Sequence, residues 1–310
     1  DGGIMTDEQT TLPRQIVVLS GKGGTGKTTV VGALATLAHD AVLADCDVDA
    51  ADLHLLLSPQ RTREESFFAG KEAVIRPDRC CGCGACAEYC RFDAIEVFPD
   101  EKGRPSYRVD PLACEGCGLC SLVCTCDAVE MIEPARGTLF VSSTRRGPLV
   151  DARLHAGGDN SGKLVTMVRN TALEIAQEEG AELILVDGPP GVACPVIASV
   201  TGADLVLLVT EPTVSGMHDL ERVAALVQQF QCPLAVCMNR SDINPELSES
   251  VCAWAEAREI PVVGVLPYDP AVVEAQVQGK SIVEYGDSPV AEEMRRVWKR
   301  IEELPKKVSN

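Results

Sequence analysis

The chain has 310 residues and an apolar fraction of 45%, enough for one large or two modest domains with a real core. Its formal charge of −18 argues against nucleic-acid binding, since contact with a phosphate backbone needs clustered Lys and Arg. No apolar run is long enough to span a membrane, and the first residues show no basic segment followed by an apolar one. We therefore expect no stable membrane insertion. The five cysteines outside the CxxC segment are scattered and form no obvious disulfide framework, so we expect a reducing cytoplasm; they are Cys46, Cys194, Cys232, Cys237 and Cys252.

The first predicted element is a short buried strand at residues 15 to 20, followed by the sequence GKGGTGKT and a helix at about 27 to 39. This order of strand, glycine loop and helix is the context of a P-loop. In such a loop, backbone amides surround phosphate oxygens, Lys27 would neutralise the β and γ phosphates, and the Thr28 hydroxyl would bind magnesium. The sequence therefore predicts a nucleotide-binding loop made of Gly21, Lys22, Gly23, Gly24, Thr25, Gly26, Lys27, Thr28 and Thr29.

Lys22 is a second lysine that the phosphate cradle itself does not require. With it, the loop resembles the deviant Walker A loop of the MinD/ParA ATPases, a superfamily that includes the Mrp-type carriers and the nitrogenase iron protein. The resemblance implies an α/β fold with a doubly wound, mainly parallel sheet. It also implies an ATP-sandwich homodimer in which Lys22 reaches the partner's nucleotide. Taken alone, Lys22 also fits a solvated loop charge.

A second predicted strand, at 41 to 45, ends in a group of carboxylates. The carboxyl ends of strands lie on the ligand side of an open α/β sheet, so these side chains are expected near the nucleotide. The resemblance implies that Asp45 lies near magnesium and that Asp47 orients the attacking water. The predicted catalytic residues are therefore Lys22, Lys27 and Asp47.

Residues 76 to 134 interrupt the α/β pattern with two copies of the spacing CxxCxxCxxxC, and the sequences that follow the two copies are also alike. In bacterial two-cluster patterns of this kind, the fourth cysteine of each copy ligates the other cluster. The module resembles bacterial two-cluster ferredoxins, although Arg91 and Thr125 replace the proline that usually follows the fourth cysteine. We therefore predict an inserted α+β domain with two 4Fe-4S clusters, one held by Cys80, Cys83, Cys86 and Cys124 and the other by Cys114, Cys117, Cys120 and Cys90.

Disulfide scaffolds and zinc ribbons also use CxxC pairs, but neither predicts eight interlocked ligands. Cys81 and Cys126 lie beside ligands but off the spacing, so we expect them to be small buried hydrophobic residues. Cys194 has the same offset from Asp187 as a cluster ligand of the nitrogenase iron protein. Because no second matching cysteine lies between residues 141 and 183, we expect Cys194 to be a buried structural thiol.

After the cysteine module the α/β pattern resumes with a predicted helix at 160 to 180, whose apolar residues are spaced for one buried face. The strand that follows ends in Asp187, as a Walker B strand does, and leads into the sequence GPPG. There the Gly191 amide is placed to sense the γ-phosphate. The predicted magnesium ligands are Thr28, Asp45 and Asp187.

Three more strands are predicted at 204 to 210, 233 to 239 and 261 to 267, which favours a parallel, doubly wound sheet. Residues at two strand ends match adenine-contacting positions of MinD-like ATPases, namely Asn239, Pro267 and Asp269, although Asn239 also suits a turn. The C-terminal segment has apolar residues at helical spacing. Its glutamates weaken attraction to anionic lipid, so we expect core packing and not membrane binding.

The expected domains are an ATPase domain formed by residues 14–75 and 135–304 and an inserted ferredoxin domain at 76–134. These features predict a homodimeric ATPase that couples hydrolysis to electron transfer from its clusters to a redox partner. The alternatives are an iron-sulfur or metal-cofactor assembly ATPase with a metalloprotein client, and a MinD-like spatial switch with structural clusters. Because the eight cysteines supply all four ligands of each cluster, we expect the clusters to be permanent, which favours electron transfer.

Overall fold

The computed structural model of the protein describes residues 12–158 and 160–305, which form two compact units. The sheet unit comprises residues 12–65, 139–153 and 161–305. The cysteine unit comprises residues 66–138, 154–158 and 160, and so extends beyond the segment 76–134 that the cysteines mark. The chain passes between the units within the strands β3 (Gln60–Phe68), β8 (Ala135–Thr144) and β9 (Gly147–Leu154), and a fourth time between residues 160 and 161.

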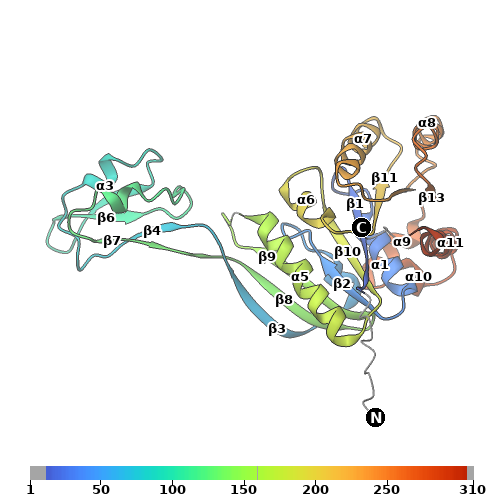
Figure 1. Cartoon of the computed structure of the whole chain (residues 1–310), viewed down its shortest axis with the longest axis horizontal. Helices are drawn as coiled ribbons and strands as arrows, with labels where there is room; N and C mark the ends of the chain where they lie inside the picture. The colour runs from blue at the N-terminus through green and yellow to red at the C-terminus, as the bar shows by residue number, and fades with distance from the viewer. Residues whose placement is uncertain (1–11, 159, 306–310) are drawn as a thin grey trace, which may run out of the picture. The chain divides into compact units, whose positions relative to one another are not determined.

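The sheet unit is built on a nine-stranded sheet in the order β13-β12-β11-β1-β10-β2-β9-β8-β3 (Figure 1). The strands from β13 to β9 pair in parallel, and most of their apolar residues are buried on both faces, as is typical of parallel strands. The predicted α/β fold with a mainly parallel sheet is therefore confirmed. Besides β3, β8 and β9, the sheet contains β1 (Arg14–Ser20), β2 (Ala41–Asp45), β10 (Leu183–Pro190), β11 (Leu205–Thr210), β12 (Leu234–Met238) and β13 (Val262–Val265).

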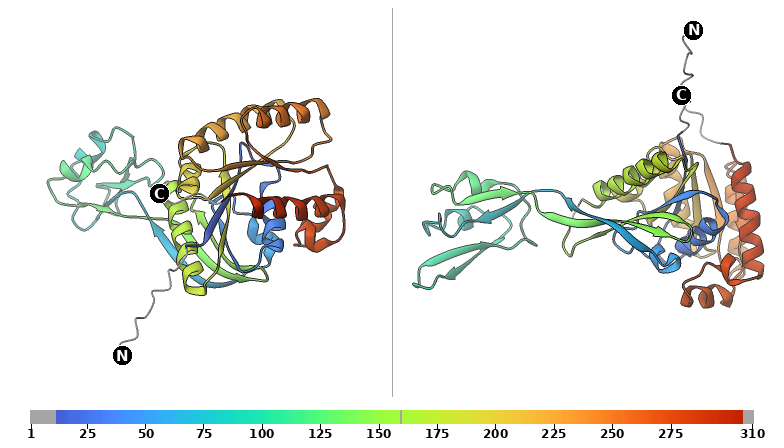
Figure 2. Two further views of the ribbon diagram at one scale, coloured as in Figure 1. Left: turned by 45° about the vertical axis from the view of Figure 1, so that its right-hand side comes forward. Right: turned by 90° about the horizontal axis from the view of Figure 1, so that it is seen from below.

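Helices cover both faces of the sheet (Figure 2). On one side α1 contacts α10 and α11, and on the other α5 contacts α6 and β2. The helices of this unit are α1 (Lys27–Leu37), α2 (Leu53–Leu57), α5 (Ser161–Glu179), α6 (Cys194–Val200), α7 (Val214–Gln229), α8 (Pro245–Glu256), α9 (Pro270–Val277), α10 (Ile282–Tyr285) and α11 (Pro289–Glu303).

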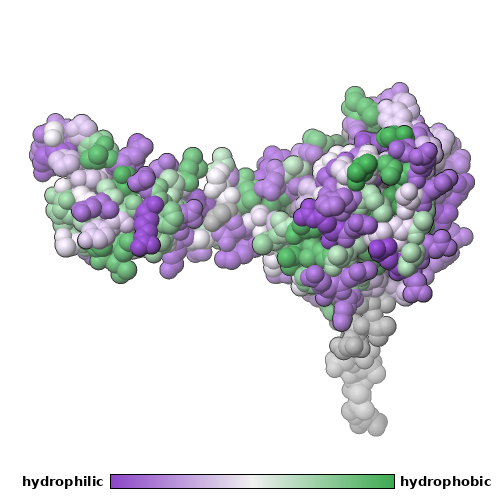
Figure 3. All heavy atoms as spheres, turned by 90° about the horizontal axis from the view of Figure 1, so that it is seen from above, coloured by the Kyte–Doolittle hydropathy of each residue, from purple (hydrophilic) through white to green (hydrophobic). Residues whose placement is uncertain are grey.

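The C-terminal helix α11 packs into the core, as its apolar spacing predicts. Val290, Met294, Val297 and Ile301 are all buried against the core beneath the sheet. No helix in the described part of the chain is long and apolar enough to cross a membrane. On the face drawn in Figure 3, hydrophilic and hydrophobic residues are interspersed over the surface.

The cysteine unit repeats one small arrangement twice. Strand β4 (Glu72–Ile75) pairs antiparallel with β7 (Val129–Ile132), and β5 (Ile95–Pro99) pairs antiparallel with β6 (Pro105–Val109). The single-turn helices α3 (Ala85–Glu88) and α4 (Leu119–Leu122) stand at equivalent places in the two copies. Each helix follows a glycine in the left-handed backbone region, Gly84 or Gly118, where a residue with a Cβ would be strained.

Candidate nucleotide and cluster sites

The loop between β1 and α1 has the shape of a phosphate cradle. Gly24 and Gly26 have φ values of 80° and 92°, and Gly26 is the residue that precedes helix α1. With these left-handed backbone conformations the loop curls so that its backbone amides lie at the positive end of the helix dipole, which favours an anion at this place. A Cβ at Gly26 would overlap the side-chain nitrogen of Asn239, so glycine is required there for space as well as for backbone conformation.

Lys27 is only 7% exposed and forms an ion pair with Asp187, and its Nζ lies 3.8 Å from a carboxylate oxygen of Asp47. Burial alone would lower the pKa of Lys27, but the three aspartates Asp187, Asp45 and Asp47 together raise it. The ammonium therefore stays charged and compensates carboxylates that would otherwise repel one another. One oxygen of Asp187 has no hydrogen-bond partner, which leaves a buried acceptor available to a cation.

Asp45 is fully buried at the end of β2, and its carboxylate organises the segment that follows. Its two oxygens accept hydrogen bonds from the backbone amides of Asp47, at 3.1 Å, and Leu53, at 3.0 Å. Burial and the neighbouring Asp187 raise the pKa of Asp45 well above its usual range. Asp45 thus links the edge of the nucleotide site to the first turn of α2.

Lys22 lies across the mouth of the loop and makes its contacts within the same chain. Its ammonium is 2.7 Å from a carboxylate oxygen of Glu211, and it donates hydrogen bonds to Ser215 at 2.9 Å and to Thr213 at 3.4 Å. Glu211 also accepts a hydrogen bond from Arg240. The Lys22 ammonium thus has three acceptors in its own chain, although its side chain is still 32% exposed.

A cavity of about 690 Å³ opens beside the loop, and the residues predicted to contact the base are among those that line it. Asn239 donates to the Thr25 carbonyl oxygen at 2.8 Å and lines the cavity. One oxygen of Asp269 caps helix α9, whereas the other is buried without a partner. Asp269 is also one of the residues that line this cavity.

The structure brings most of the predicted nucleotide residues to this cavity. The predicted residues that line it are Gly23, Gly24, Gly26, Lys27, Thr28, Thr29, Asp47, Asn239, Pro267 and Asp269. Those that lie outside its lining are Gly21, Lys22, Thr25, Asp45, Asp187 and Gly191. Gly191 donates its amide to the Ser20 carbonyl at 2.9 Å, so in this state the amide is not available to a phosphate.

Two residues of the site were missed by sequence reasoning. Glu211 holds Lys22, and its position directly after β11 is a signal that could have identified it, because strand ends gather at the ligand edge of the sheet. Gln276 lines the cavity and donates to the Thr29 hydroxyl at 2.7 Å. Nothing in the sequence around Gln276 marks it as different from other polar residues of a helix.

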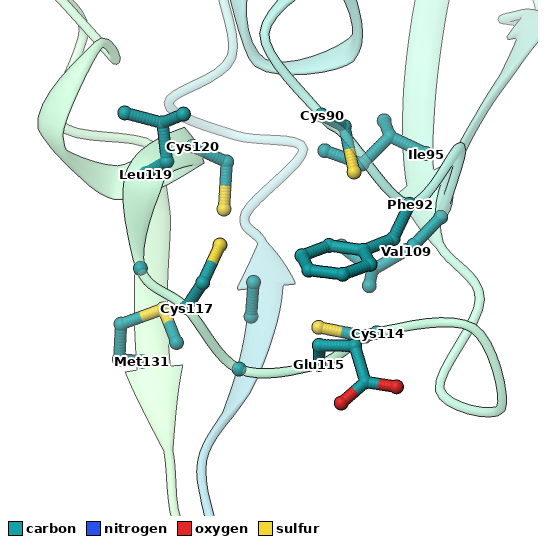
Figure 4. Close-up of a pocket in the computed structure, with 14 residues that line it drawn as sticks. Cys90, Phe92, Ile95, Val109, Cys114, Glu115, Cys117, Leu119, Cys120 and Met131 are labelled. Atoms are coloured by element: carbon teal, nitrogen blue, oxygen red, sulfur yellow. The ribbon is translucent and has the colours of Figure 1, made fainter.

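The cysteine unit holds two cavities, each lined by four free cysteines. One cavity is lined by Cys80, Cys83, Cys86 and Cys124. The other is lined by Cys90, Cys114, Cys117 and Cys120, whose sulfur atoms are directed into it (Figure 4). Each cavity therefore combines three cysteines of one copy with the fourth cysteine of the other. This is the same grouping that the interlocked spacing predicts.

The chemistry of the first cavity suits a thiolate-bound group. Burial raises the pKa of Cys86, which favours the neutral thiol until a positive charge is present. Burial alone would also raise the pKa of Cys124, but several backbone N–H groups, that of Ala128 foremost, together lower it. The Ala128 amide lies 3.2 Å from the Cys124 sulfur.

Within residues 12–158 and 160–305, no three His, Cys, Asp or Glu side chains are close enough together to hold a single metal ion. A single tetrahedral ion with bonds of about 2.3 Å would require sulfur atoms roughly 3.8 Å apart. A cubane places a different iron atom at each thiolate, so it accepts ligands that are more widely separated. Each set supplies four thiols, which is the number of thiolates that one cubane binds.

Two expectations about the remaining cysteines are wrong. Cys81 and Cys126 are not small buried hydrophobic residues: they form a disulfide, and Cys81 is exposed. The bond is possible because the two copies of the motif fold against each other, which brings together residues 45 positions apart. Cys194 is not a buried thiol either; it is exposed because it begins helix α6 at the surface.

A glycine loop between a parallel strand and a helix, with a buried lysine and acidic strand ends beside it, defines a P-loop nucleotide-binding protein. The chain belongs to the CobQ/CobB/MinD/ParA nucleotide binding domain family, whose profile matches residues 16–282. MinD and ParA members of this family are ATPases.

Individual relatives agree with this assignment. An uncharacterized protein of Methanocaldococcus jannaschii is 35% identical over 233 residues, which cover 74% of this chain and 79% of the relative. The septum site-determining protein MinD of Pyrococcus horikoshii OT3, solved with Mg-ADP, is 18% identical with a TM-score of 0.54 and covers 94% of this chain and 96% of its own. The cell division ATPase MinD of Pyrococcus furiosus is 22% identical with a TM-score of 0.54, and the match covers 95% of this chain and 100% of that one. At these identities the solved structures show a shared fold.

Proposed function

We propose that the protein is a homodimeric ATPase that couples nucleotide hydrolysis to electron transfer from two 4Fe-4S clusters in the cysteine unit to a redox partner. The observation that carries this proposal is the grouping of eight free cysteines around two cavities, three from one copy and one from the other in each. Clusters bound by four thiolates each are permanent groups suited to electron transfer, since none of their ligands has to be shared with a client.

In the sheet unit, magnesium would be held by Thr28, Asp45 and Asp187 and would neutralise charge on the phosphates. Residues of the chain would bind the phosphates and orient the attacking water. Lys27 is paired with Asp187 in the structure, and phosphate oxygens provide new partners for its ammonium. Asp47 lies beside the phosphate cradle, where its carboxylate can orient a water molecule.

The nucleotide would also change contacts that define the present state. Lys22 would exchange Glu211 for the nucleotide of a second copy, and the Gly191 amide would exchange the Ser20 carbonyl for the γ-phosphate. Both exchanges are reversed when the γ-phosphate leaves, so the loops differ between the ATP and ADP states. The alternation of these states would drive the dimer cycle and make electron delivery dependent on ATP.

The test is ATP turnover by anaerobically reconstituted protein, measured with the clusters oxidised and then reduced, with each state verified by EPR. We expect turnover to differ between the two states. We also expect Lys22→Ala and Asp47→Ala to lower turnover without changing cluster absorbance, whereas Lys299→Ala, at an exposed position of α11, serves as the control. Unchanged turnover in both site variants would reject their roles, and turnover independent of redox state would favour metallocentre assembly over electron transfer.

A further inference from the structure

The disulfide between Cys81 and Cys126 lies on the first of the two cysteine cavities. Cys81 directly follows Cys80, and Cys126 comes two residues after Cys124, so the bond joins the two copies of the motif beside two predicted cluster ligands. Cys81 is exposed and Cys126 is partly buried. The bond is therefore open to an external molecule on one side and borders the four free thiols on the other.

The duplication provides an internal comparison for this bond. When the two copies are aligned on their cysteines, Cys81 corresponds to Glu115 and Cys126 corresponds to Phe92. Glu115 and Phe92 both line the second cavity (Figure 4). The equivalent positions thus form equivalent walls, and the second cavity has its shape without a disulfide. A cavity of this kind does not need the bond in order to form.

The rest of the chain does not use disulfides as a framework. None of the other thirteen of its fifteen cysteines, all of which lie in the described part of the chain, forms a disulfide. In a chain that keeps its thiols reduced, a lone disulfide is more often catalytic or redox-sensing than structural. Exposed disulfides are also those that exchange most readily with external thiols. Exposure of Cys81 and the position of the bond therefore favour a redox role.

We propose that Cys81 and Cys126 form a redox centre that exchanges electron pairs with a dithiol protein. A thiolate of the partner attacks the sulfur of Cys81, the more exposed of the two residues, the bond to Cys126 breaks, and Cys126 leaves as a thiolate that takes a proton from water. The second thiol of the partner then attacks the mixed disulfide and releases Cys81. The partner is oxidised by two electrons to its disulfide, and Cys81 and Cys126 become two thiols.

This inference rests on the proposed function only for the exchange of electrons with the clusters. Two bound 4Fe-4S clusters, each a one-electron group, would together supply the two electrons that reduction of the disulfide needs, and the two thiolates would take two protons from water. Exchange with an external dithiol needs no cluster.

The matched variant copies the second cavity into the first by replacing Cys81→Glu together with Cys126→Phe. Cluster-loaded protein is titrated anaerobically with dithionite, and we expect wild type to take up about four electrons per chain and the double variant about two. Separately, native wild type is equilibrated with dithiothreitol, alkylated with a maleimide and mapped by peptide mass spectrometry. We expect Cys81 and Cys126 to become alkylated together without unfolding. If the double variant loses iron, Cys81→Ser with Cys126→Ser takes its place in the titration.

Equal electron uptake by wild type and variant, with full iron content in both, would overturn the disulfide centre and leave the proposed function standing. Reduction of the bond only after denaturation would identify a structural staple and would also overturn the inference. Exchange with dithiothreitol in native protein that binds no iron would instead support the disulfide centre and refute the proposed electron transfer from clusters.

Discussion

Glu284 is the centre of an ion-pair network that fixes the turn between β8 and β9, and its replacement tests the electrostatic account of the sheet unit. Its carboxylate accepts hydrogen bonds from Arg145 at 2.8 and 2.9 Å and from Arg146 at 2.7 Å, and it completes a capping box with Ser281. Burial alone would raise the pKa of Glu284, but these donors lower it from 4.5 to about 2. That fall in pKa corresponds to roughly 3 kcal/mol of stabilisation of the folded state by the ionised carboxylate.

The expected effect of Glu284→Gln is a loss of about 2 to 3 kcal/mol of unfolding free energy at pH 7, since the side chain is only 10% exposed. The contribution of Glu284 to the unfolding free energy is present above pH 4.5 and is lost as the pH falls towards 2, because the carboxylate is then protonated in the folded and the unfolded state alike. The difference between wild type and variant should therefore shrink below pH 4.5.

Urea unfolding followed by tryptophan fluorescence measures this effect in one unit, because both tryptophans, Trp254 and Trp298, belong to the sheet unit. The control is Glu292→Gln, which removes a carboxylate that is 61% exposed and pairs with Arg296 on the surface of α11. A loss from Glu284→Gln no larger than that of the control, or a loss that does not change with pH, would refute the reasoning.

Two further predictions concern the nucleotide site. Gly26→Ala should weaken the binding of Mg-ADP at least tenfold in calorimetry, because the φ of Gly26 is 92° and a Cβ there would overlap Asn239. The control is Gly23→Ala, which should bind Mg-ADP almost normally because a Cβ at Gly23 meets open space. Equal affinities of the two variants would contradict this view of the loop. Glu211→Gln should strengthen ATP-analogue-dependent self-association severalfold in sedimentation, because Lys22 loses a partly exposed ion pair in its own chain. Weaker association would mean that Glu211 helps the dimer.

The sequence was most informative where function depends on consecutive residues. The strand, loop and helix of the P-loop are contiguous, so the position of Lys27 at the start of α1 follows from the motif alone. Glu211 was missed because its role depends on β11 lying next to β1, and strand order is a property of the whole sheet. The motif spacing likewise grouped the eight cysteines around two cavities, as the structure does.

The disulfide was missed for a different reason. Cys81 and Cys126 are 45 residues apart and match no motif, and adjacency to ligands suggested only small buried side chains. The alignment of the two copies held the available signal, because both cysteines stand where the other copy has residues without thiols, Glu115 and Phe92. A departure from an internal repeat is thus a better guide to a special site than spacing alone.

The most direct test of the central claim is the iron and acid-labile sulfide content of the anaerobically reconstituted protein. The account predicts about eight iron and eight sulfide per chain, because each cavity offers four cysteines to one cubane. Fewer than about six iron atoms per chain would contradict the assignment of two 4Fe-4S clusters, and with it the proposed coupling of ATP hydrolysis to electron transfer.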